Sequence, residues 1–423
     1  MVQELTRLSR RSLVLGSAGG LAALSLAGCG GSGGGGGTAT TTLGSQWSDP
    51  VPKKALAGVL SAYKKTGGAV DLNQFDHESF PQQLNNYLQG RPDDTFTWCA
   101  GYRTQFFAQQ GLLTPIDDVW DDIGDNFSPA LEKQSLGLDD KHYVVPFYYY
   151  PWAMFYRKSV FAERGYAVPT TLDELTSLCD TMTADGLSPI AFGDKDGWPA
   201  MGTFDILNMR VNGYDFHASL MRGDEAWDGS EVRAVFDTWA DLLPYHQEAS
   251  LGRTWQEAAQ SLGDGTSGMY FLGLFVGQQF TGADLDDLDF FAFPEIDSAI
   301  GADAIDAPID GFLLSKRPKD AGAAKDFLRF LGTAEAQDTY LGLDPSNIAA
   351  AADADTSGYT ALQKKAADLV AASQSVAQFM DRDTRPDFAS TVMLPSIQEF
   401  IQDPGSISSI LTSVEEQKQS IFQ

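Results

Sequence analysis

Residues 141–158, KHYVVPFYYYPWAMFYRK, decide how the chain can fold. Most positions between Pro146 and Tyr156 are aromatic, and a second proline, Pro151, interrupts the run. Because proline fixes φ and lacks a backbone N–H, this stretch cannot form one regular helix and fits poorly in a central strand. We predict an extended segment that is kinked at Pro151 and continues as a strand from Ala153.

The aromatic side chains of this stretch, among them Tyr150 and Trp152, suit carbohydrate binding. Their flat apolar faces can stack on sugar rings while their polar rims take hydrogen bonds. The competing interpretation for each single ring is a seam of the aromatic core. A loop after the strand-like run 189–192 adds another ring and a carboxylate, Trp198 and Asp196.

The chain before this stretch alternates strand patterns with helix patterns. We expect strands at 40–47, 69–74 and 94–99 and helices at 53–66, 80–89 and 103–110. Such alternation predicts an α/β fold with crossover helices, in which ligands bind beyond the carboxyl ends of the strands. That rule brings to one edge the residues that follow the three strands: Trp47, Asp76, His77, Trp98, Tyr102 and Arg103.

Composition excludes several classes of protein. The chain has 423 residues, 43% of them hydrophobic, which is enough for two or three domains with real cores. It carries 57 acidic and 29 basic residues and a net charge of −28, so nucleic acid and anionic lipid surfaces would repel it. The three cysteines and four histidines show no metal-binding spacing. We expect neither a metal nor a cofactor.

The first 39 residues predict export and anchoring. Arg10 and Arg11 precede an apolar run at 13–27, which is typical of a signal peptide, and residues 26–29, LAGC, resemble a lipobox. We expect a signal peptide at 1–28, a lipidated Cys29 and a glycine-rich tether at 29–39. Residues 9–14 resemble a twin-arginine signal, with ordinary secretion as the alternative. The alternative for Cys29 is a small buried cysteine.

The order of the motifs resembles family 1 extracellular solute-binding proteins of sugar ABC transporters, the maltose-binding-protein-like family. No single motif is specific, but together they run from the lipobox to the C-terminus. They are QGLLTPIDD at 110–118, the aromatic stretch at 145–158, FAERG at 161–165, PTTLDEL at 169–175, DGWP at 196–199, GMYFLG at 268–273, DGF at 310–312 and KDFLRFL at 325–331.

This resemblance implies two α/β lobes with parallel or mixed sheets and a ligand cleft between them. The first lobe would comprise 40–149 and 310–345, and the second 150–309 and 346–423. The protein would capture a sugar or oligosaccharide and deliver it to the membrane permease. It would be a monomer held by its lipid at the extracellular face of the cell membrane, without catalysis. Cys99 would lie at the cleft edge and Cys179 on a second-lobe helix, as two free thiols.

The resemblance also assigns site residues. Trp98 matches a stacking tryptophan, with Tyr102 and Arg103 near a polar pair, and Trp198 matches the Trp-Pro loop of the family. Tyr150 departs from the family's maltose binder, which has an acidic contact at that point. The remaining candidates are Gly273 and Phe275, Asp310 at the second crossover, and Asp381, whose alternative is a solvated charged loop.

Two other classes of protein remain open from the sequence. A secreted carbohydrate-active hydrolase would need two carboxylates about 5–9.5 Å apart across a cleft, and 57 acidic residues always offer some pair. No nucleophile elbow, HExxH or P-loop pattern is present. A binding protein for a polyol or polyamine would use similar aromatic rings and isolated acids.

Overall fold

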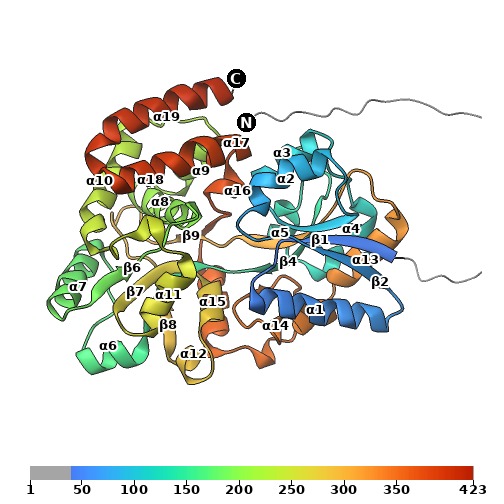
Figure 1. Ribbon diagram of the computed structural model, residues 1–423, viewed down its shortest axis with the longest axis horizontal. Helices are drawn as coiled ribbons and strands as arrows, with labels where there is room; N and C mark the ends of the chain where they lie inside the picture. The colour runs from blue at the N-terminus through green and yellow to red at the C-terminus, as the bar shows by residue number, and fades with distance from the viewer. Residues whose placement is uncertain (1–39, 423) are drawn as a thin grey trace, which may run out of the picture. The chain divides into compact units, whose positions relative to one another are not determined.

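The computed structural model describes residues 40–422, which contain two principal β-sheets flanked by helices (Figure 1). One sheet has six strands in the order β11-β4-β10-β3-β1-β2, and the other has four in the order β6-β7-β5-β8. We call each sheet with its helices a lobe, the six-stranded one first. The α/β class predicted from the sequence is confirmed.

The first lobe begins with the predicted alternation, and the expected strand at 69–74 and helix at 80–89 have the observed bounds. β1 pairs in parallel with β2 and β3, whereas β10 pairs antiparallel with β3 and β4. The strands are β1 (Thr40–Ser45), β2 (Ala69–Gln74), β3 (Thr95–Cys99), β4 (Val144–Tyr149), β10 (Ile309–Leu314) and β11 (Ile348–Ala349). The helices are α1 (Pro50–Lys65), α2 (Phe80–Gln89), α3 (Tyr102–Gln109), α4 (Asp117–Ile123), α5 (Pro129–Gln134), α13 (Ala321–Leu331) and α14 (Ala334–Leu341).

Strand β4 corrects one expectation about the aromatic stretch. It contains Pro146 and lies between β11 and β10, so a proline does occupy an inner strand. Gly311 of β10 faces Pro146, and the register shifts between Asp310 and Gly311. Such a bulge accommodates a residue that lacks an N–H donor. A Cβ at Gly311 would collide with the carbonyl oxygen of Val145, so this approach requires glycine.

The six-stranded sheet is buried on both faces. Leu313 of β10 packs with Phe80 of α2, whereas its neighbour Phe312 belongs to the larger cluster with Phe327 of α13. Successive residues of a strand point to opposite faces, so each face needs its own layer of helices. This double covering holds the carboxyl ends of the strands in place, where the sequence predicts the ligand.

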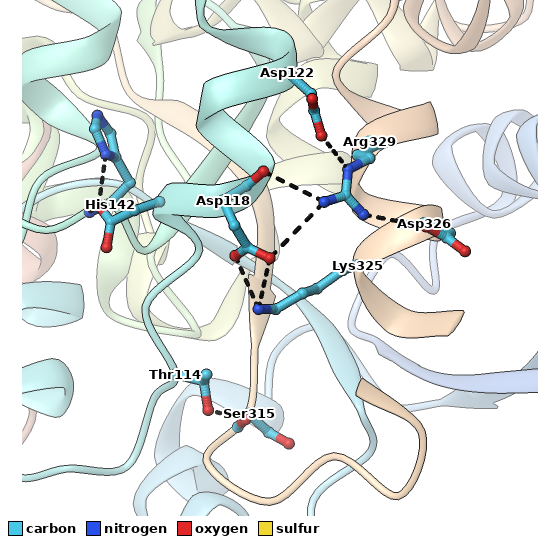
Figure 2. Close-up of polar contacts among 9 residues, drawn as sticks. Thr114, Asp118, Asp122, His142, Ser315, Lys325, Asp326 and Arg329 are labelled. Atoms are coloured by element: carbon cyan, nitrogen blue, oxygen red, sulfur yellow. Dashed lines mark hydrogen bonds and ion pairs between the residues drawn. The ribbon is translucent and has the colours of Figure 1, made fainter. Parts of the chain in front are cut away.

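Charged side chains tie α13 to α4 on the outside of the first lobe (Figure 2). Lys325 Nζ donates to Asp118 Oδ1 at 2.8 Å, and Arg329 Nε donates to Asp122 Oδ2 at 2.6 Å. Arg329 Nη1 also donates to Asp326 within α13 at 3.1 Å. The segment that follows β10 therefore packs on the first lobe.

The second lobe is built around the four-stranded sheet and the central helix α8, which is buried along most of its length. Trp227 and Trp239 are fully buried in its core. Its strands are β5 (Trp152–Arg157), β6 (Ser188–Ala191), β7 (Ser267–Gly273) and β8 (Leu288–Phe291). Its helices are α6 (Lys158–Arg164), α7 (Leu172–Ala184), α8 (Trp198–Val211), α9 (Tyr214–Met221), α10 (Ser230–Leu242), α11 (Trp255–Gly263), α12 (Ala283–Asp287), α17 (Pro386–Phe388), α18 (Leu394–Gln402) and α19 (Ile407–Ile421).

Several short elements lie where the chain passes between the lobes. They are the small parallel sheet of β9 (Ala304–Asp306) and β12 (Ser375–Ala377), with α15 (Ala361–Ala372) and α16 (Met380–Asp383). The chain crosses after β4, before β10 and after β11. Because β11 pairs with β4 in the first-lobe sheet, the third crossing comes later than the expected boundary at residue 345.

The predicted signal peptide, the lipobox at Cys29 and the tether lie outside the described residues. Between residues 40 and 422, no helix is both long and apolar enough to span a membrane. Cys99 and Cys179 are buried, and both are free thiols.

Candidate functional site

A cavity of about 190 Å³ lies between the two lobes and is lined from both. Its first-lobe wall comes from residues just after β1, β2 and β3, in accordance with the rule for α/β sheets. Its second-lobe wall comes from β5, the start of α8 and the turn that follows β7. The segment around α16 closes it at the crossing strands. Aromatic rings and charged groups dominate this lining.

On the first-lobe side, Trp98 and Arg103 form one unit. The guanidinium carbon of Arg103 lies 4.8 Å from the centre of the Trp98 ring, so a cation covers one ring face. Trp98 is only 3% exposed and packs with Phe80 in the core of this lobe. Replacing Trp98 would therefore open the core as well as the cavity. Trp47 is similarly buried, against Phe147 and other rings.

On the second-lobe side, rings pack edge to face around the cavity. Trp152 lies 6.1 Å from Trp198 at an interplanar angle of 90°, and Phe275 lies 5.2 Å from Trp255 at 86°. The Trp152 ring packs so closely on Gly202 of α8 that a Cβ there would collide with it. The indole nitrogen of Trp152 is covered by protein and has no hydrogen-bond partner among the described residues. This ring therefore offers a ligand apolar surface rather than a donor.

Two reciprocal ion pairs connect α16 to the first lobe. Arg103 Nη1 donates to Asp381 Oδ2 at 3.2 Å, and Arg382 Nη1 donates to Asp310 Oδ1 at 2.9 Å. Arg382 Nη2 also donates to the Tyr150 hydroxyl at 3.0 Å. All five groups line the cavity. A carboxylate accepts several hydrogen bonds, so a ligand hydroxyl can share Asp310 or Asp381 with its arginine.

The backbone of α16 is fixed from the second lobe. The N–H of Met380 donates to Asp205 Oδ2 of α8 at 2.6 Å, and the preceding residue, Phe379, has a φ of 118°. A bulky residue at positive φ is strained, and it persists only where its surroundings hold it. Gly101 approaches the Arg382 carbonyl so closely that a Cβ would lie 2.9 Å from its oxygen. Figure 1 shows α16 between α8 and α3. It is therefore a joint that both lobes share.

Burial shifts the pKa values of titratable groups in and near the cavity. Burial raises the pKa of Asp194 to about 7, although the N–H of Ala200 and the amide of Gln398 donate to it and oppose the shift. Burial also raises the pKa of Glu78, opposed by His77 and reinforced by Asp196. Burial raises the pKa of the Cys99 thiol in the lining to about 12. This cysteine is therefore a poor nucleophile at neutral pH.

The structure brings most of the predicted site residues together. The cavity is lined by Trp47, His77, Trp98, Arg103, Tyr150, Trp152, Trp198, Phe275, Asp310 and Asp381. Asp76, Tyr102 and Gly273 are not in the lining. Asp76 is exposed, and its Oδ1 accepts from the N–H of Ser79 at the start of α2. Tyr102 begins α3, and Gly273 ends β7, where it leaves room for the Phe275 ring.

Sequence reasoning missed three important residues of the lining: Glu78, Trp255 and Arg382. Trp255 is only 3% exposed and packs in the core, but it also borders the cavity. Arg382 could have been found beside Asp381, since an arginine in a charged loop near a buried acid is a natural partner. Glu78 carried no signal apart from its place after β2.

Within residues 40–422, no group of three or more His, Cys, Asp or Glu side chains could hold a metal ion. The polar groups of the cavity are two arginine–carboxylate pairs, one histidine, further carboxylates such as Asp49 and Asp196, and several amides and hydroxyls, and much of the remainder is aromatic. This set suits a neutral ligand with many hydroxyl groups and ring faces.

Two lobes around a shared cavity, joined by crossing strands, are typical of the class of solute-binding proteins. Residues 38–338 match the family of bacterial extracellular solute-binding proteins, and the chain belongs to that family. The resemblance read from the sequence is thereby confirmed.

The fold is similar to that of several solved solute receptors. The bacterial solute receptor AcbH has 47% identity and a TM-score of 0.89, and the similarity covers 92% of this chain and 100% of that one. Its structure is described with an exclusive preference for β-D-galactopyranose. A chitin oligosaccharide binding protein has a TM-score of 0.82 with 22% identity, covering 90% of this chain and 99% of that one.

Curated relatives are more distant. An ABC transporter extracellular-binding protein of Pyrococcus horikoshii is 29% identical over 282 residues, which are 66% of this chain and 62% of that relative. This match thus spans less than two thirds of the relative's own length. The alpha-glucosides-binding periplasmic protein AglE of Rhizobium meliloti is 23% identical over 71% of this chain and 70% of its own.

Proposed function

We propose that this protein captures a sugar in the cavity between its lobes and delivers it to the permease of an ABC importer. The observation that carries the proposal is the lining itself, in which aromatic rings from both lobes surround two arginine–carboxylate pairs. Rings such as Trp152 and Trp198 supply apolar contact with sugar faces, and the charged pairs strengthen hydrogen bonds to hydroxyls. Family membership supports transport rather than another use of the cleft.

Galactopyranose is the first ligand to test. AcbH, described with an exclusive preference for that sugar, shares 47% of its residues with this chain over 92% of the length. The cavity volume of about 190 Å³ is consistent with a small sugar. Binding needs no catalysis, and we propose that the protein releases its ligand unchanged, in contrast to a hydrolase.

Placement at the membrane is part of the proposal. The lipobox-like LAGC at 26–29 supports a lipid on Cys29, and more than one acyl chain would be needed for stable anchoring. We propose a monomer at the extracellular face of the cell membrane, exported by the twin-arginine or the general route. Cys29→Ala should release the protein from the membrane fraction, and retention of that variant would contradict the anchor.

Calorimetry on the purified protein tests the ligand class. The panel is D-galactose, D-glucose, maltose, sorbitol and spermidine, with thermal unfolding alongside, since a ligand that binds only the folded state raises the melting temperature. We expect D-galactose to bind most tightly. Binding of sorbitol or spermidine alone would contradict the sugar assignment. Appearance of free monosaccharide after long incubation with lactose would indicate a hydrolase instead.

A further inference from the structure

The indole N–H of Trp198 donates to Glu78 Oε2 at 3.0 Å, across the cavity from one lobe to the other. Glu78 lies in the turn between β2 and α2 of the first lobe, and Trp198 is the first residue of α8 in the second. Both residues line the cavity. This hydrogen bond therefore joins the two walls directly.

The bond lies on the solvent side of the cavity. Tyr150 and Asp310, beside the crossing strands, are 7% exposed, whereas Glu78 and Trp198 are only half-buried. The neighbouring His77 and Asp196 are half-buried too. The lobes are thus linked at two ends, by Arg382–Asp310 at the crossing strands and by Glu78–Trp198 at the mouth.

Both partners of the bond are held in position. Trp198 follows Gly197, whose N–H donates to the Asp194 carbonyl at 3.1 Å, and Asp194 also accepts from the Ala200 N–H at 2.9 Å. Glu78 is held by its turn, because the N–H of the adjacent His77 donates to Ser48 Oγ at 3.0 Å. Preorganised partners lose little entropy on closing.

The bond also limits the space at the mouth. A sugar ring between two walls needs them roughly 7–8 Å apart, twice the van der Waals contact distance of about 3.5–4 Å. The donor and acceptor atoms here are 3.0 Å apart. A second sugar ring cannot pass between them while the bond is made.

We propose that Glu78 is a latch that holds Trp198 across the mouth, slows release of the bound sugar and restricts the site to a single sugar ring. The inference rests on the proposed sugar-binding function and names the size class of its ligand. Glu78 is a positioning residue, since it acts through Trp198. A latch of this kind forms after the ligand has entered, so it governs the dissociation rate more than the association rate.

Stopped-flow fluorescence with D-galactose tests the latch. We expect Glu78→Ala and Trp198→Phe each to raise koff at least tenfold and to change kon less than threefold, because both remove the bond. Glu78→Gln keeps an acceptor oxygen and should remain close to the wild-type protein. The matched control is Trp120→Phe, which removes a 2.9 Å indole bond to the Val144 carbonyl, away from the cavity lining, and should leave koff unchanged.

A size comparison completes the test, with lactose as the two-ring sugar. The ratio of the lactose Kd to the galactose Kd should fall at least tenfold in Glu78→Ala. Unchanged koff and an unchanged ratio in variants with wild-type thermal stability would overturn the latch while leaving sugar binding intact. A wild-type protein that binds no sugar would overturn the proposed function and the latch with it.

Discussion

Arg382 in the cleft and Arg329 on the outside of the first lobe make ion pairs of the same chemistry in different surroundings. The side chains of Arg382 and Asp310 are 17% and 10% exposed, at 2.9 Å. Those of Arg329 and Asp122 are 32% and 58% exposed, at 2.6 Å (Figure 2). Water therefore has access to the Arg329–Asp122 pair but has little access to the Arg382–Asp310 pair.

The difference shows that burial, rather than distance, decides how much stability is lost when one partner of a charge pair is removed. An exposed pair gains about 0–1 kcal/mol, because water screens it and holding two long side chains costs entropy. A buried pair contributes little net stability either, but it becomes indispensable once formed, since either partner alone would be a buried unpaired charge. The Arg382–Asp310 pair thus holds α16 against the first lobe. The Arg329–Asp122 pair adds little to the contact between α13 and α4.

The strongest test of this comparison is a substitution of Arg382, for which we expect the largest loss of stability. Arg382→Ala leaves Asp310 buried without its cation and removes the donor to the Tyr150 hydroxyl. We expect the free energy of unfolding to fall by about 3–5 kcal/mol, measured by urea denaturation. The double variant Arg382→Ala/Asp310→Ala should recover part of that loss. A loss below about 1 kcal/mol for the single variant would mean that the cleft pair behaves like a surface pair.

Asp194 sharpens the comparison, because it is buried and its carboxylate accepts hydrogen bonds from a backbone N–H and an amide rather than from a cation. Its pKa is raised from 3.8 to about 7, so the folded state keeps a proton that the unfolded state has lost. This contribution to stability is complete below pH 3.8 and is lost as pH rises toward 7, by about 1.4 kcal/mol for each pH unit.

Asp194→Asn removes this titration, since an amide stays neutral. The unfolding free energy of the variant minus that of the wild-type protein should therefore increase between about pH 4 and pH 7 and then level off. Denaturant titrations across this range measure it. A difference that stays constant with pH would show that the Asp194 carboxyl titrates as it does in the unfolded chain.

A substitution of Trp198 tests what an uncharged residue of the cleft contributes, in contrast to the charge pairs. Trp198→Ala removes a ring from the mouth of the cavity and the donor to Glu78. We expect at least tenfold weaker sugar binding, about 1.4 kcal/mol, by calorimetry with D-galactose. Because Trp198 is half-buried, thermal unfolding should change little. Unchanged affinity would place this ring outside the binding surface.

The smallest effect is expected for the network of Figure 2. Asp118→Ala removes the partner of Lys325, whose Nζ lies 2.8 Å from Asp118 Oδ1, yet Arg329 keeps its bonds to Asp122 and Asp326. We expect less than about 1 kcal/mol of lost stability, further reduced by salt, and no change in sugar affinity. A large loss here would mean that the exposed pairs also carry the fold.

Local pattern determined much of the fold. The strand at 69–74 and the helix at 80–89 follow from hydrophobic periodicity and from stop signals such as Gly90, and both have the expected bounds. The rule that ligands sit beyond strand ends predicted Trp98 and Arg103 at one edge of the sheet, and both line the cavity there. Asp76, which the same rule named, lies outside the lining, because a residue in the turn before a helix and one that faces a cleft carry the same sequence signal.

The sequence by itself therefore determined the class of protein, through its two-lobed α/β body and the aromatic rings near its strand ends. It also predicted the export and lipid signals, which remain to be tested. The tertiary structure alone decided the partners. Pro146 fits an inner strand only because a bulge at Gly311 faces it, and Glu78 meets Trp198 only because two lobes converge. Periodicity reports which side of one element is buried, whereas contacts between residues 120 positions apart depend on how whole lobes pack.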